Sequence, residues 1–159
     1  MGFLQGRIAR RAVVAREDWT LLVVGASDGV LPIQLQKSLF LLGQRFPELS
    51  ATGFYEFRPV GGGDFSEQIY TDVEALGKKD LVSVRFSDGT GGREYRLTPA
   101  GAKRAKKLEE QLRPELSQSL RKLVSWVTTR TMDQLLRGSR DTKGAIHPNS
   151  VGQASARPH

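Results

Sequence analysis

The stretch that most constrains the fold is residues 65–101. Apolar residues first recur there at the three- and four-residue spacing of one helix face, namely Phe65, Ile69, Val73 and Leu76. The alternating patterns of 81–86 and 93–97 then predict two strands, and the loop 87–92 supplies the glycines that a hairpin turn needs. Thr98 is the expected N-cap of a further helix. Helix, strand, glycine-rich loop, strand and helix in this order are the layout of a winged helix.

Two helices and a strand are predicted before this stretch, over 17–27, 33–45 and 54–58. The second helix places Lys37 on the side opposite its leucines, and Asp64 is the expected N-cap of the central helix. Helices are predicted after the stretch, over 98–112 and 115–130, with a final short helix beginning at a capping box of Thr131 and Gln134.

These elements predict one α+β, winged-helix-like domain over 17–138, with about six helices, a strand before the central helix and a β-hairpin wing. A flexible basic arm, 1–16, and a polar disordered tail, 139–159, are expected on either side. The chain has no cysteine, which favours the cytoplasm. No apolar run approaches the roughly 20 residues of a membrane span, so no membrane contact is expected.

The formal net charge of +7 is unevenly distributed along the chain. Residues 1–16 carry +4 and residues 139–159 carry +2, whereas 17–138 combines 17 Lys+Arg with 16 Asp+Glu. A domain that binds nucleic-acid backbone usually carries its excess of cations on the folded part. Here most of the net positive charge lies in the two ends of the chain instead, which weakens the charge argument for nucleic-acid binding.

No catalytic set is evident, and the chain is predicted not to be an enzyme. Both histidines, His147 and His159, lie in the predicted tail, where a general base cannot be held in position. Asp72 and Glu74 are interpreted as part of a solvated helix face. No spacing of His, Asp and Glu predicts a metal site, and no cofactor is expected.

The remaining prediction is binding, and a winged helix suggests DNA as the ligand. Ser66, Gln68 and Thr71 are candidates for contact with base edges. The candidates for phosphate contact are Lys78, Lys79, Arg85, Arg93, Arg96, Lys103, Arg104 and Lys107. Ordinary solvated surface is the alternative interpretation for all of these residues.

Two motifs resemble the SocA-like antitoxin (Panacea) proteins and related bacterial proteins. The first is LQKSLFLL at 35–42, and the second is FYEFRP at 54–59 followed by GDFSEQIY at 63–70. This chain has Asp64 where the family pattern has proline. The resemblance implies a winged-helix-like domain that either binds a partner protein, as these antitoxins bind their toxins, or regulates transcription.

DNA-associated transcriptional regulation is the favoured function, and an antitoxin-like protein-interaction module is the alternative. The segment 46–64 separates the second helix from the central helix, where a helix-turn-helix has only a tight turn. The near-neutral domain and the acidic central helix favour a protein partner, whereas the basic ends and the arginines of the wing favour DNA. The apolar stripe of residues 116–127 is either a homodimer interface or part of the core.

Overall fold

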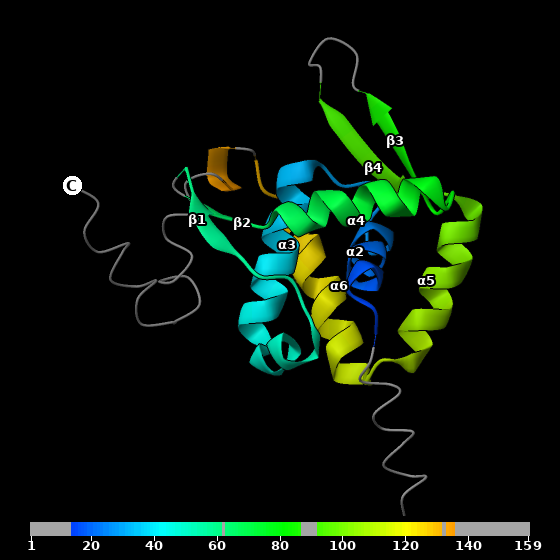
Figure 1. Cartoon of the computed structure of the whole chain (residues 1–159), viewed down its shortest axis with the longest axis horizontal. Coiled ribbons are helices and arrows are strands. Elements are labelled where there is room, and N and C mark those ends of the chain that lie inside the picture. Colours follow the sequence, from blue (N-terminus) through cyan, green and yellow to red (C-terminus); the bar gives the residue numbers. More distant parts are fainter. Residues whose placement is uncertain (1–13, 62, 87–91, 132, 136–159) are drawn as a thin grey trace, which may run out of the picture.

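The computed structural model describes residues 14–61, 63–86, 92–131 and 133–135. It confirms an α+β fold of winged-helix-like order (Figure 1). The helices are α2 Arg16–Gly25, α3 Pro32–Arg45, the 3₁₀-helix η1 Pro47–Thr52, α4 Glu67–Lys78, α5 Pro99–Gln111 and α6 Pro114–Thr128. The strands are β1 Arg58–Val60, β2 Gly63–Phe65, β3 Val82–Phe86 and β4 Arg93–Leu97.

Helix α2 lies in the middle of the molecule and packs against α3, α4, α5 and β4 (Figure 1). Seven consecutive residues, 18–24, are buried, so no side of this part of the helix faces solvent. A helix that is buried all round needs apolar or paired side chains on every side. The buried residues of α2 include the polar Asp18 and Thr20 as well as apolar side chains.

The predicted wing is confirmed in its two strands. β3 and β4 pair antiparallel, with Val84 opposite Tyr95, and Tyr95 also exchanges backbone hydrogen bonds with Val30 at 2.8 and 3.0 Å. Thr98 caps α5, since its hydroxyl accepts a hydrogen bond from the backbone N–H of Gly101 at 2.9 Å. The wing is thereby anchored to the body of the molecule at the middle of β4 and directly after its C-terminal end.

The strand predicted over 54–58 is wrong, because Phe54 and Tyr55 are both buried and do not alternate between two faces. The strands lie further along the chain, where β1 and β2 pair antiparallel as a two-stranded β1–β2 ribbon. Gly61 adopts a φ of 58° between them. Phe65 accordingly belongs to β2 and not to the central helix. The N-cap position of α4 is Ser66, so the expected capping by Asp64 is also wrong.

The apolar stripe of α6 is part of the core of this chain. Its buried members are Leu116, Leu120, Val124 and Val127, and α6 packs against α3. Of the two alternatives for this stripe, the structure therefore supports the core of the chain, and nothing supports a homodimer interface there. The capping box at the following short helix is confirmed, since Thr131 and Gln134 exchange hydrogen bonds of 2.9 and 3.0 Å.

Several predictions lie outside the described residues: the arm up to residue 13, most of the wing loop and the tail from residue 139. Val14 is buried in the core and α2 begins at Arg16, so packed residues already occur before residue 17. Within the described part of the chain, every helix is too short or too polar to cross a membrane.

Candidate nucleic-acid interface

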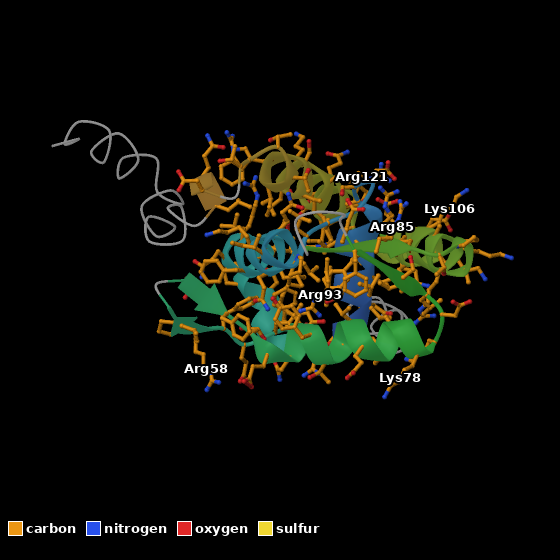
Figure 2. All side chains as sticks on the ribbon, turned by 90° about the horizontal axis from the view of Figure 1, so that it is seen from above. Arg58, Lys78, Arg85, Arg93, Lys106 and Arg121 are labelled. Carbon is orange, nitrogen blue, oxygen red and sulfur yellow. The ribbon has the colours of Figure 1, made fainter. Side chains whose placement is uncertain are left out.

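Charge is segregated within the folded part of the chain, although its sum is close to zero. Residues 14–86 carry seven Lys+Arg and ten Asp+Glu, whereas residues 92–131 carry ten Lys+Arg and only four Asp+Glu. The first range forms α2 to β3, and the second forms β4, α5 and α6. Figure 2 shows Arg85 and Arg93 on the wing, between Lys78 at the end of α4 and Lys106 on α5. The wing and α5 are therefore the candidate basic surface.

The two wing arginines lie on opposite faces of the hairpin. In an antiparallel ribbon, residues directly opposite each other share a face. Arg93 pairs with Phe86, on the face that also holds Val84 and Tyr95, whereas Arg85 pairs with Glu94 on the other face. Both arginines are exposed. The wing can thus contact phosphates on either side, but it has no single basic face.

Arg96 differs from the other two wing arginines because acidic neighbours already hold it. Its Nε lies 2.9 Å from Glu94 and one terminal nitrogen lies 3.5 Å from Asp28, while the side chain is only 34% exposed. The hydrogen bond that Arg96 donates to the Glu94 carboxylate raises the pKa of Arg96. Arg96 was predicted as a phosphate ligand, and the structure instead places it in an ion-pair cluster at the base of the wing.

Helix α5 presents three lysines to solvent, Lys103, Lys106 and Lys107. Among the described residues none of the three forms an ion pair. Arg104, predicted with them, instead donates to the buried Asp18 of α2 at 3.1 Å. An ion pair that neutralises a buried carboxylate has a structural role, because an unpaired buried charge is costly. The α5 surface that remains for a ligand is the lysine triplet.

The exposed face of α4 offers less than predicted for reading bases. Ser66 is only 2% exposed, so its prediction as a base-reading residue is wrong. Gln68 is half-buried and its Oε1 accepts from the backbone N–H of Glu56 at 3.3 Å. Thr71 is exposed, but the residues one turn away on either side are Glu67 and Glu74. An acidic surface of this kind opposes approach to the DNA backbone.

The C-terminal end of α4 is more favourable for an anion. Lys78 and Lys79 are both exposed, as predicted. Lys79 forms an ion pair with Glu17, whereas Lys78 has no ion pair among the described residues. Lys78 therefore extends the basic surface from the wing to the end of α4.

The start of α4 is fixed by a side chain that sequence reasoning missed. The amide of Gln36 accepts from the backbone N–H of Ser66 at 3.0 Å and donates to its carbonyl at 2.9 Å, and both residues are buried. The side-chain amide of Gln36 thus pairs with both backbone polar groups of Ser66, as a neighbouring strand would. Gln36 belongs to the LQKSLFLL motif at 35–42. Its neighbour Lys37 is also buried, contrary to its predicted exposure. Burial lowers the pKa of the Lys37 ammonium, and the nearby Asp64 opposes that shift.

A second buried polar cluster joins α2 to α4. Arg16 donates two hydrogen bonds to Asp72, of 2.9 and 3.0 Å, and the hydroxyl of Tyr55 lies 2.6 Å from both Asp72 and Thr20. Asp72 is 5% exposed, so its prediction as part of a solvated face is wrong. The signal was present in the sequence, because position 72 shares the helix face of Ile69, Val73 and Leu76.

Metal-binding geometry is not evident in the described ranges, where no group of three or more His, Cys, Asp or Glu side chains is placed to hold an ion. Neither the protein-family models nor the curated proteins compared with this chain match it.

Proposed function

We propose that this chain is a non-enzymatic, cytoplasmic winged-helix protein that associates with duplex DNA in transcriptional regulation. The observation that carries this proposal is the group of exposed cations on the wing and on α5 that form no ion pair among the described residues: Arg85, Arg93, Lys103, Lys106 and Lys107. They lie on the wing and on α5, two elements in direct contact. Long flexible cations around a projecting hairpin suit contact with phosphates.

The proposed binding mode differs from that of a helix-turn-helix. The acidic side chains of α4 and the β1–β2 hairpin at its start do not favour insertion of α4 into the major groove. The wing and α5 instead provide contacts with the backbone, which carry little sequence information. We expect modest sequence preference and a strong dependence of affinity on salt concentration.

The test is the affinity of the full chain for a random duplex, measured by fluorescence anisotropy. Replacement of both wing cations, Arg85→Ala with Arg93→Ala, should weaken binding about twofold to thirtyfold, because each exposed ion pair contributes about 0.2–1 kcal/mol. The matched control is Arg45→Ala with Lys122→Ala, which removes the same charge from α3 and α6. These two side chains line a groove away from the wing.

If both double variants weaken binding equally, the affinity reflects net charge alone and the wing is not the binding site. Absence of measurable binding by the unaltered chain at low salt would contradict the DNA proposal as a whole.

An antitoxin-like protein-interaction role is the second candidate, favoured by apolar side chains on the wing. Phe86 is 70% exposed and Val84 is 42% exposed, on a face shared with Arg93. β3 also has only β4 as a neighbour among the described strands, which leaves its outer edge open for strand addition. Isotope-edited chemical-shift mapping with a candidate partner would support this role if Phe86 and Val84 shift, and would contradict it if both remain unchanged.

A further inference from the structure

A groove of about 790 Å³ lies between α3 and α6, two helices that pack against each other (Figure 1). Its lining residues on α6 extend from Glu115 to Trp126, which is about three turns of helix, or roughly 16 Å along the helix axis. Among the described residues, none from the wing or from α5 lines this groove. It is therefore separate from the proposed DNA-binding surface, and its length suits an extended ligand.

The groove contains the exposed tryptophan of the chain. Trp126 is 47% exposed, whereas the side chain of Trp19 is 3% exposed. Leu41 of α3 and Leu123 of α6 line the groove together with Trp126, and both are half-buried. Aromatic side chains are enriched in protein interfaces, where they fill the buried centre of the contact. These three residues thus form an apolar strip that a partner can cover.

Three cations surround this apolar strip. Arg45 and Lys122 line the groove, are exposed and form no ion pair among the described residues. The guanidinium carbon of Arg130 lies 4.4 Å from the ring centroid of Trp126, and this side chain also has no carboxylate partner in the described ranges. The acid in the described lining, Glu115, is already engaged in an ion pair of 3.6 Å. Available charge at the groove is therefore positive, and it favours acidic groups beside an apolar ligand face.

The two ends of this chain do not match the groove in charge. Residues 1–13 carry three arginines and no acid, and residues 136–159 carry four Lys+Arg and one Asp. Like charges brought together across an interface oppose association. The occupant that fits the charge of the groove is therefore a segment of another protein.

We infer that the α3–α6 groove binds an acidic amphipathic helix of a partner protein. The apolar face of such a helix covers the strip around Trp126, and the Asp and Glu side chains beside that face pair with the three cations. A groove between two helices, about three turns long, accommodates a third helix. This site goes beyond the proposed DNA association and does not depend on it.

The test follows the indole N–H signals of the ¹⁵N-labelled full chain by NMR during titration with a synthetic peptide. The peptide has about four helical turns, with leucines on one face and glutamates on the others. We expect a saturable shift of the Trp126 signal and an unchanged signal of the buried Trp19, and Trp126→Phe assigns the two signals. A peptide of the same composition, scrambled so that the leucines are spread around the helix, should not produce a saturable shift.

Two double variants localise the binding. Arg45→Glu with Lys122→Glu should weaken peptide binding at least about fivefold, because two attractions become repulsions. Lys103→Glu with Lys106→Glu makes the same change in net charge on α5 and should weaken binding less than about twofold, since salt screens distant exposed charges.

The inference is overturned if the Trp126 signal does not saturate, if the scrambled peptide binds as tightly, or if both double variants have the same effect. A Trp126 signal that shifts with the concentration of the chain alone would place a second copy in the groove, and would overturn the inference as well.

Discussion

Gly101 permits the close contact between α5 and the chain entering the wing. A Cβ atom built at this position would lie 1.9 Å from the backbone carbonyl oxygen of Leu81, and the same carbonyl accepts a hydrogen bond from the N–H of Thr98 at 3.0 Å. Backbone cannot yield as the end of a flexible side chain can. Gly101 is therefore required for close approach, although it lies inside a helix.

Gly101→Ala should lower the free energy of unfolding by about 1–3 kcal/mol, since the added methyl group overpacks the contact with Leu81. Gly77→Ala is the matched control, because a Cβ there meets its nearest neighbour at an ordinary 3.8 Å. Alanine in a helix should leave stability unchanged or raise it by up to about 1 kcal/mol. Urea unfolding followed by circular dichroism measures both, and a stable Gly101→Ala variant would contradict the packing described.

Tyr55 should make the free energy of unfolding depend on pH in the alkaline range. Burial and the hydrogen bond with Asp72 both raise the pKa of the Tyr55 phenol. An unfolded chain ionises its tyrosines near pH 10. Above that pH the folded chain keeps the proton and the unfolded chain loses it, so stability should be complete below about pH 10 and fall as the pH rises further.

The measurement is the urea midpoint of the unaltered chain and of Tyr55→Phe at pH 8, 10 and 11. Tyr55→Phe should be less stable at pH 8 because it loses the hydrogen bond with Asp72, and its stability should fall less steeply with pH. Some dependence should remain, since burial also raises the pKa of Tyr95. Identical pH dependence in both proteins would show that Tyr55 ionises freely in the folded state.

At the scale of elements, the wing and the β1–β2 ribbon show what the sequence could predict. The strands of the wing were predictable because alternation, glycines and the Thr98 cap agree locally. The β1–β2 ribbon was not, because Phe54 and Tyr55 resemble strand residues but are both buried by tertiary packing. The hydrogen bonds between the Gln36 amide and the Ser66 backbone join residues 30 positions apart, and no local sequence pattern indicates them.

Arg93 and Arg96 of the wing should contribute unequally to DNA binding. Arg93→Ala should reduce the affinity for a random duplex and lower the slope of log K against log [salt] by about 0.9, the value for one lost phosphate contact. Arg96→Ala should change the slope less, because Glu94 and Asp28 already engage this side chain. Anisotropy titrations at four salt concentrations give both slopes, and a larger effect of Arg96→Ala would contradict this assignment.

At the scale of the whole molecule, the net charge of the folded part conceals how its charges are distributed. The folded part sums to nearly zero because the acidic residues of α2 to β3 offset the cations of β4 to α6. Which cations remain available depends on distant partners, such as Asp18 for Arg104 and Glu17 for Lys79. These pairs join residues 86 and 62 positions apart, so only the folded chain distinguishes paired cations from unpaired ones.

The central claim, that the folded domain itself binds DNA, is tested most directly by comparing fragment 14–138 with the full chain. The fragment begins at Val14 because Val14 is buried and Arg16 pairs with Asp72. The measurement is the salt dependence of binding to a random duplex. We predict that the fragment keeps a steep slope, set by the wing and α5. A slope near zero for the fragment beside a steep slope for the full chain would assign binding to the ends and contradict the claim.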